Sequence, residues 1–237
     1  MDGVVFAGYT PAEALKKLAS LKVPCVQVGT NVDPESGVQC FTSDLGRAFE
    51  QVVRRLRELG HRRVQLVLPS GPGPEAWAKK FRNLASIVLG VEPEIALMPT
   101  LASNRESALA HASAVLKLLP RERPTAFICN PVHSQALAEG LASGGLVCPR
   151  DYSMVCFGTL DSEDQRLFPG NVRLSFIVLP IEEAGRRAAA TLLRRIDGEA
   201  NGMSADGRAR GGTCPTTYIP CEVIFAESCG PARGCES

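Results

Sequence analysis

The segment from Val38 to Pro69 constrains the fold more than any other part of this chain. A short apolar run at 38–42 is followed by apolar residues that recur at helical spacing through 45–59. Gly60 is placed to end that helix, and a second β-rich run follows at 64–68. A strand, an amphipathic helix and a second strand in this order predict a βαβ unit, and such a unit implies a parallel sheet.

The same alternation continues through the rest of the chain. Further strands are predicted at 4–8, 23–28, 95–98, 125–129, 153–157 and 174–178. Further helices are predicted to open at Thr10 and to span 75–89, 107–118, 133–143 and 181–197. Residues 199–218 are expected to form a surface loop, and residues 228–237 a tail. Strands that alternate with helices predict an α/β fold with parallel sheets.

Composition excludes several classes of protein. The chain has 237 residues, 45% of them hydrophobic, so it can bury the core of one large domain or two small ones. Its net charge is only +1, and the basic run at 54–57 is interpreted as a solvated helix face, which disfavours direct nucleic-acid binding by this chain. The apolar runs are too short for a transmembrane helix, and no signal peptide precedes the first strand. We therefore expect no membrane partner and a cytoplasmic location.

Nine cysteines raise the question of metal or disulfide chemistry. Cys25, Cys40, Cys129 and Cys156 lie inside apolar strands, where a free thiol behaves as a small hydrophobe. The C-terminal cysteines form no C-x-x-C pair, so reduced thiols are expected, with a metal site in that cluster as a minor alternative. The sequence also lacks a P-loop, a dinucleotide fingerprint and a readable catalytic triad. We expect no cofactor and no enzymatic activity.

Eight short motifs occur along the chain in one order. They are DGVVFAG at 2–8, VPCVQVG at 23–29, TSD at 42–44, LRELGHRRVQLV at 56–67, PTAFICN at 124–130, GLVCPRDYSMVCFG at 145–158, LPIEEAGRRAAATLLRRIDG at 179–198 and IPCEVIFAESC at 219–229. Together they resemble the ligand-sensing, periplasmic-binding-protein-like domain of the Lac/Gal repressor (LacI/GalR) family of bacterial transcription regulators. The resemblance implies two Rossmann-like, parallel-sheet subdomains of the type I periplasmic-binding-protein-like fold. It also implies a small-molecule effector, a sugar or related metabolite, in the cleft between them.

The resemblance maps residues 1–60 and 171–198 onto the first subdomain, and residues 61–157 and 219–227 onto the second. Members of the family carry a helix-turn-helix and about two strand–helix units before the DGVVFAG strand. The resemblance therefore implies that the first subdomain lacks its first strands here. It further implies a homodimer that meets DNA only through a helix-turn-helix absent from this chain. A stand-alone, sugar-type binding protein with no DNA role is the alternative.

The same resemblance points to effector-binding residues at the strand ends. Many sugar-responsive members carry an Asn-Asp pair after the PTAFICN strand and an Asp directly after the CFG strand. Here Asn130 is followed by Pro131, and Gly158 and Thr159 stand where the second Asp is expected. A carboxylate that accepts from two hydroxyls is the natural clamp for a sugar, so its loss disfavours a simple sugar as the effector.

Each remaining candidate has two interpretations. Asp44 either contacts the effector or caps the helix at 45–59, and one carboxylate can do both. Arg82 is either a fork of donors for the ligand or a solvated helix residue. Asn130 is either a ligand contact or a turn residue. Trp77 is either an aromatic platform or part of the core.

Overall fold

The structure, a computed structural model, describes residues 2–8, 23–29, 38–98, 104–160, 167–168, 170–197 and 216–232, together with isolated positions between 10 and 20. Most of the predicted helix at Thr10 and most of the predicted loop at 199–218 lie outside these residues. The chain forms two compact units. The first contains Met1–Leu45 and Pro180–Cys221, and the second contains Gly46–Leu179 and Glu222–Ser237.

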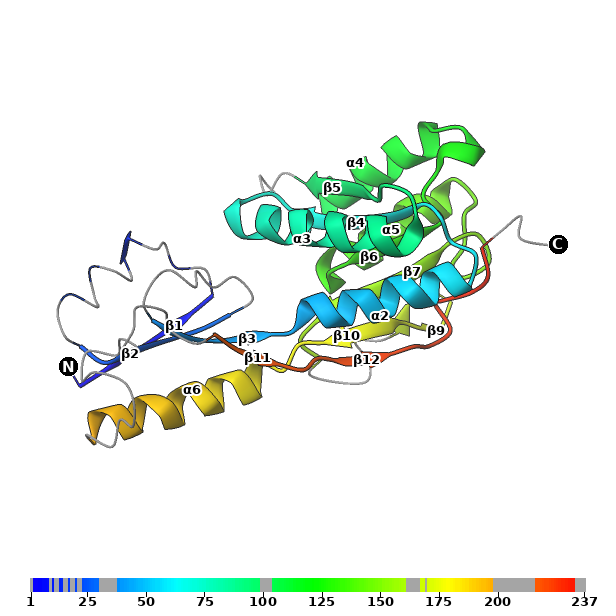
Figure 1. Cartoon of the computed structure of the whole chain (residues 1–237). Helices are drawn as coiled ribbons and strands as arrows, with labels where there is room; N and C mark the ends of the chain where they lie inside the picture. Colours follow the sequence, from blue (N-terminus) through cyan, green and yellow to red (C-terminus); the bar gives the residue numbers. More distant parts are fainter. Residues whose placement is uncertain are drawn as a thin grey trace. The chain divides into compact units, whose positions relative to one another are not determined.

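The first unit is built on a four-stranded parallel sheet in the order β1-β2-β3-β11. Its strands are β1 (Val4–Ala7), β2 (Cys25–Val28), β3 (Gln39–Ser43) and β11 (Thr216–Ile219). Helix α6 (Ile181–Ile196) runs along this sheet (Figure 1). It buries Ala184, Ala188 and Leu192 against Val26 and Phe41. These small and branched side chains recur at helical spacing, so one face of α6 packs on the sheet.

The second unit is built on a six-stranded sheet in the order β12-β10-β7-β6-β4-β5. Its strands are β4 (Val64–Pro69), β5 (Glu94–Met98), β6 (Ala126–Cys129), β7 (Ser153–Gly158), β10 (Ser175–Val178) and β12 (Glu222–Ile224). All neighbours are parallel except β10 and β12. A small antiparallel pair, β8 (Leu167–Phe168) and β9 (Val172–Arg173), was not predicted. The predicted α/β class with parallel sheets is confirmed in both units.

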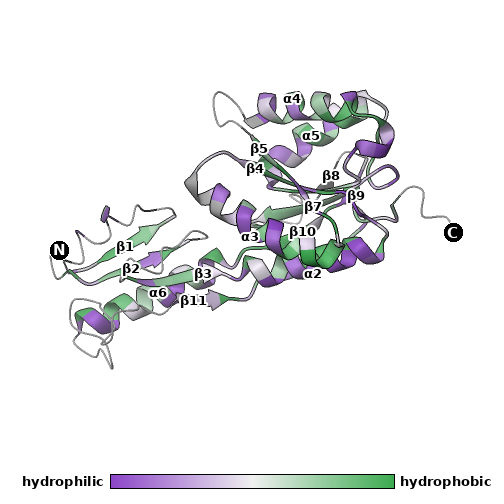
Figure 2. Ribbon diagram, turned by 45° about the horizontal axis from the view of Figure 1, so that its top comes forward, coloured by the Kyte–Doolittle hydropathy of each residue, from purple (hydrophilic) through white to green (hydrophobic). Residues whose placement is uncertain are grey.

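Helices flank the strands of the second unit. They are α2 (Leu45–Glu58), α3 (Pro72–Leu89), α4 (Asn104–Lys117) and α5 (Pro131–Ser143), with a 3-10 turn η2 at Pro120–Glu122. Helix α2 follows β3 of the first sheet and precedes β4 of the second, so the predicted βαβ unit does not join two strands of one sheet. Gly60 and Gly90 adopt φ values of 87° and 73° just after α2 and α3. This left-handed conformation is easy for glycine, and it ends both helices where the sequence predicts. Figure 2 shows hydrophobic and hydrophilic residues alternating along α2.

Alternate residues of the central strands face two different helical layers. Phe127 on β6 and Met154 on β7 belong to a buried cluster that includes Ala112 of α4 and Leu141 of α5. Phe157 on β7 faces the other layer, where its ring meets Phe49 of α2 edge-on with centroids 5.8 Å apart. Both faces of the sheet are thus covered, and this explains why its strands are apolar runs without polar alternation.

The division of the chain differs from the predicted boundaries. Residues 171–178 were assigned to the first subdomain, but β10 lies in the second sheet because it pairs with β7 and β12. Helix α2 was also assigned to the first subdomain, yet its Phe49 packs on Phe81 of α3 and on Phe157. Conversely, 216–218 were included in a loop and form β11 beside β3. Pairing with strands that are distant in the sequence decides to which of the two sheets β10 and β11 belong.

Part of the predicted tail at 228–237 is packed into the second unit. Ser228 is fully buried, its Oγ donates to the Met154 carbonyl at 2.6 Å, and the Ser175 N–H donates to that Oγ at 2.7 Å. The Ala232 N–H donates to the Leu59 carbonyl at 2.8 Å. The prediction of a frayed tail was therefore wrong for residues 228–232. Their small side chains give no apolar pattern, and hydrogen bonds hold them instead.

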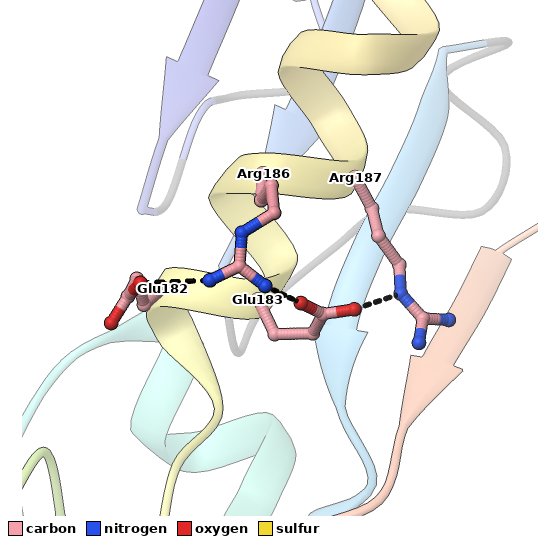
Figure 3. A network of polar contacts seen from close by, with 4 residues as sticks. All are labelled: Glu182, Glu183, Arg186 and Arg187. Atoms are coloured by element: carbon pink, nitrogen blue, oxygen red, sulfur yellow. Dashed lines mark hydrogen bonds and ion pairs between the residues drawn. The ribbon is translucent and has the colours of Figure 1, made fainter.

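The first turns of α6 carry a ladder of charged residues (Figure 3). Arg186 pairs with Glu182 at 2.8 Å and also with Glu183, and Arg187 pairs with Glu183 at 2.7 Å. Both arginine side chains are more than half exposed. Water and salt screen such pairs strongly, so the ladder contributes little to stability.

We therefore expect Arg186→Ala and Arg187→Ala each to shift the midpoint of thermal unfolding by less than about 2 °C. Differential scanning fluorimetry at low and at 0.5 M salt measures this. A large, salt-independent loss would contradict the assignment of the ladder to the solvated surface. Leu192→Ala on the buried face of the same helix provides the contrast, with a clearly lower midpoint.

None of the helices in the described ranges is long and apolar enough to cross a membrane.

Candidate ligand-binding pocket

A pocket lies in the second unit, where β6 and β7 end and α5 begins. Its volume is about 600 Å³, a size usual for small-molecule sites. The lining residues come from these strand ends, the first turn of α5 and the two flanks of β10: Asn130, Pro131, Val132, Ser134, Gln135, Phe157, Gly158, Thr159, Leu174 and Leu179. Ligands of open parallel sheets sit at the carboxyl ends of the strands, which is where most of this lining lies.

Asn130 joins the pocket to the start of α5. Its Oδ1 accepts from the His133 N–H at 3.0 Å, so the side chain caps the helix, and Pro131 follows at the first helical position. The two interpretations of Asn130 are therefore compatible. The oxygen serves the cap, and the side-chain NH2 remains the donor that this residue can offer to a ligand.

Pro131 and Gly158 touch across the pocket floor. A Cβ placed on Gly158 would lie 3.2 Å from Cδ and 3.4 Å from Cγ of Pro131. The Leu179 N–H donates to the Gly158 carbonyl at 2.8 Å and fixes the backbone there. Glycine thus fits closely at 158, since a Cβ there would need the proline ring to shift by a few tenths of an ångström.

The walls of the pocket are apolar. Phe157 meets Phe49 edge-on, and Leu174 and Leu179 are the other apolar residues of the lining beside Pro131 and Val132. Thr159 is exposed at the mouth, and the buried Ser134 donates its hydroxyl to the Pro131 carbonyl at 2.9 Å. No charged side chain belongs to the lining among the described residues.

Three of the six predicted site residues meet in this pocket, namely Asn130, Gly158 and Thr159. The resemblance placed them correctly at two neighbouring strand ends. That they bind a ligand stays a prediction.

Arg82 and Trp77 lie on α3 and are not part of this lining. Arg82 is exposed and pairs with Glu92 at 3.3 Å. Trp77 meets Phe49 edge-on with centroids 6.4 Å apart, and the Lys80 Nζ lies 5.1 Å from its ring centre. These contacts favour the core interpretation for Trp77 and the solvated interpretation for Arg82.

Asp44 belongs to the first unit. Its N–H donates to the Ile219 carbonyl at 2.8 Å, which links the ends of β3 and β11. Burial, followed by the Asp44 charge, raises the pKa of the nearby Cys221 thiol to about 11. Asp44 is therefore placed at a strand end as predicted, in a different unit from the pocket residues.

Pro131 was noted in the sequence only as a departure from the family, and sequence reasoning missed the other pocket residues: Val132, Ser134, Gln135, Phe157, Leu174 and Leu179. Val132 and Gln135 are three positions apart on the first turn of α5, a spacing that puts both on one side of the helix. Because Asn130 was already predicted as a site residue just before this helix, the spacing of Val132 and Gln135 in its first turn could have predicted these two residues. Within the described ranges, no group of three His, Cys, Asp or Glu side chains could hold a metal ion.

Residues 53–208 match the family described as the periplasmic binding protein-like domain. The chain belongs to this family. The match covers more than half of the sequence, and the predicted recognition is confirmed.

Relatives of this periplasmic binding protein-like domain include bacterial transcription regulators. The chain is 28% identical over 210 residues to the HTH-type transcriptional regulator GntR of Pseudomonas aeruginosa, covering 83% of this chain and 56% of the regulator. The chain thus spans little more than half the length of that curated relative.

Among solved structures, a LacI family transcriptional regulator from Bifidobacterium animalis subsp. lactis has a TM-score of 0.78 at 22% identity, covering 98% of this chain and 79% of that one. A LacI family regulator from Enterococcus faecalis with bound ribose has a TM-score of 0.75 at 19% identity, covering 98% and 79%. At these identities the likeness establishes the fold.

Proposed function

We propose that this chain is the effector-sensing domain of a bacterial transcription regulator of the LacI type, and that the pocket of the second unit holds part of its small-molecule effector. The observation that carries this proposal is the 600 Å³ pocket at the carboxyl ends of β6 and β7, lined by Asn130, Gly158 and Thr159. The family match and the regulator relatives support it.

The proposal includes the finer points that the resemblance implies. The chain acts without catalysis, in the cytoplasm and as a homodimer, and DNA is contacted through a helix-turn-helix outside this chain. The P. aeruginosa relative supports the DNA role, since its name describes an HTH-type regulator. A stand-alone binding protein remains the second candidate. Reading the DNA upstream of the Met1 codon separates the two, because an in-frame helix-turn-helix supports the regulator and a signal peptide contradicts it.

Ligand binding is tested by thermal shift of the whole chain against a library of carbohydrates and related metabolites, followed by calorimetry of each hit. A ligand of the folded state raises the unfolding midpoint by mass action. We expect Asn130→Ala to weaken a hit by at least about 10-fold, because a polar contact is removed. Asn130→Ala also removes a helix cap.

Asn130→Asp is the matched control, because aspartate keeps the cap while replacing the side-chain NH2. It should unfold like the parent protein and yet bind the hit more weakly. If both variants bound every hit as the parent does, the pocket would not be the effector site.

A further inference from the structure

Phe157 lies between the pocket and the buried aromatic cluster of the second unit. It belongs to the pocket lining and is partly exposed. Its ring also meets the ring of Phe49 on α2, with centroids 5.8 Å apart and planes at 86°. Phe49 is 2% exposed and lies outside the described lining. Phe49 therefore packs against a wall residue of the pocket without being part of the wall.

The ring of Phe49 is itself packed against two aromatic residues of α3. Phe81 meets it edge-on, with centroids 5.3 Å apart, and Trp77 does so at 6.4 Å. Phe81 is as deeply buried as Phe49, at 1% exposure. A side chain enclosed in a close-packed interior keeps one rotamer on the time average. Phe49 thus provides a fixed surface for the ring of Phe157.

This contact decides how freely the Phe157 ring can move. An aromatic side chain at a pocket wall can change its χ angles unless a neighbour packs against it. An edge-on contact favours one orientation, because the positive edge of one ring meets the negative face of the other. A ring that is already fixed loses less conformational freedom when a ligand binds, and this raises the affinity.

Resting on the proposed function, we infer that Phe49 is a positioning residue of the effector site: it sets the orientation of the Phe157 ring and thereby the affinity of the pocket. Phe49 does so without contacting the effector. Helix α2 contributes to effector binding through this contact, although the described lining comes from the strand ends, α5 and the flanks of β10.

The first test compares Phe49→Leu with Phe81→Leu in the whole chain. Each variant removes one ring from the same buried cluster and keeps most of the side-chain volume. Among the described residues, Phe81 pairs with Phe49 and not with Phe157, so its variant controls for general loosening of the cluster. Calorimetry gives the Kd of the tightest-binding member of the carbohydrate and metabolite library. Thermal unfolding shows that each variant is folded at the titration temperature.

We expect Phe49→Leu to raise this Kd at least about 3-fold, because the ring of Phe157 must then be ordered on binding. Phe81→Leu should change it by less than about 1.5-fold. An unchanged Kd in Phe49→Leu would overturn the inference, and so would equal increases in the two variants.

A double-mutant cycle with Phe157→Leu tests whether Phe49 acts through Phe157. Phe157→Leu alone should raise the Kd, and adding Phe49→Leu should raise it no further, because residues that act through one contact are not additive. Additive increases would overturn the inference. If the library hit depended on Asn130 and not on Phe49, the proposed function would stand without it. If no member of the library bound the parent chain, both would be contradicted.

Discussion

Phe49→Ala is expected to lower the free energy of unfolding by about 3–5 kcal/mol, the range for truncating a buried aromatic residue. Phe49 is 2% exposed, and its ring meets Trp77, Phe81 and Phe157 edge-on at centroid distances of 6.4, 5.3 and 5.8 Å. Its loss leaves a cavity and removes three aromatic contacts at once. Because Phe49 joins α2 to α3 and β7, we expect the largest loss of any single truncation in this layer.

Urea unfolding followed by tryptophan fluorescence measures this effect. Trp77 is the only tryptophan of the chain and touches Phe49, so its emission reports on the second unit. Phe49→Leu keeps most of the volume and should cost clearly less. Ile87→Ala on α3 is the surface control, since Ile87 is 83% exposed. A similar loss in Ile87→Ala would contradict the assignment of the effect to the aromatic cluster.

His61→Ala is expected to cost about 2–4 kcal/mol, because it leaves buried polar groups without partners and creates a cavity. His61 is 1% exposed, and its ring nitrogens lie 3.0 Å from Thr125 Oγ1, 2.9 Å from Ser153 Oγ and 3.0 Å from the Gly230 carbonyl. These partners come from three separate segments of the second unit. One imidazole thus holds together the end of α2, the start of β7 and the C-terminal segment.

The same residue predicts a pH dependence. Burial lowers the pKa of His61 below its ordinary value, and burial does the same for His111 and His133. Below a pH of about 6.5 the unfolded chain binds protons that the folded chain does not, so stability falls as the pH decreases. Glu94 acts in the opposite direction at lower pH, because burial raises its pKa.

We therefore expect the free energy of unfolding to decrease between pH 7.5 and pH 5.5. His61→Gln, which stays neutral, should make this decrease shallower. Urea titrations at several pH values measure both slopes. An unchanged slope in His61→Gln would show that the other histidines carry the effect.

The elements of the second unit were largely predictable because their signals are local. The apolar spacing at 45–59 and the glycines at 60 and 90 gave α2 and the ends of α2 and α3 to within a residue or two. The sequence does not show to which of the two sheets a strand belongs. The run at 174–178 is equally apolar in either unit, and only its pairing with β7 and β12 places it.

The pocket was predictable in part for the same reason. Asn130 and Gly158 end neighbouring strands, and parallel strands bring their ends together. Leu174 and Leu179 flank β10, whose place beside β7 was not foreseen. The hydroxyl of Ser228 could not be foreseen either, since its partners Met154 and Ser175 are distant in sequence.

The contact between Pro131 and Gly158 also affects which substitutions this site can accept during evolution. A side chain at 158 would press on the proline ring, so an acidic residue there requires the Pro131 ring to shift by a few tenths of an ångström. Thr159 is exposed and meets no such obstacle, and aspartate at position 131 would suit the first turn of a helix. If this site evolved specificity for charged ligands or for ligands with many hydroxyl groups, we therefore expect the first substitutions at position 131 or 159. A change at position 158 is easier once the proline has been replaced.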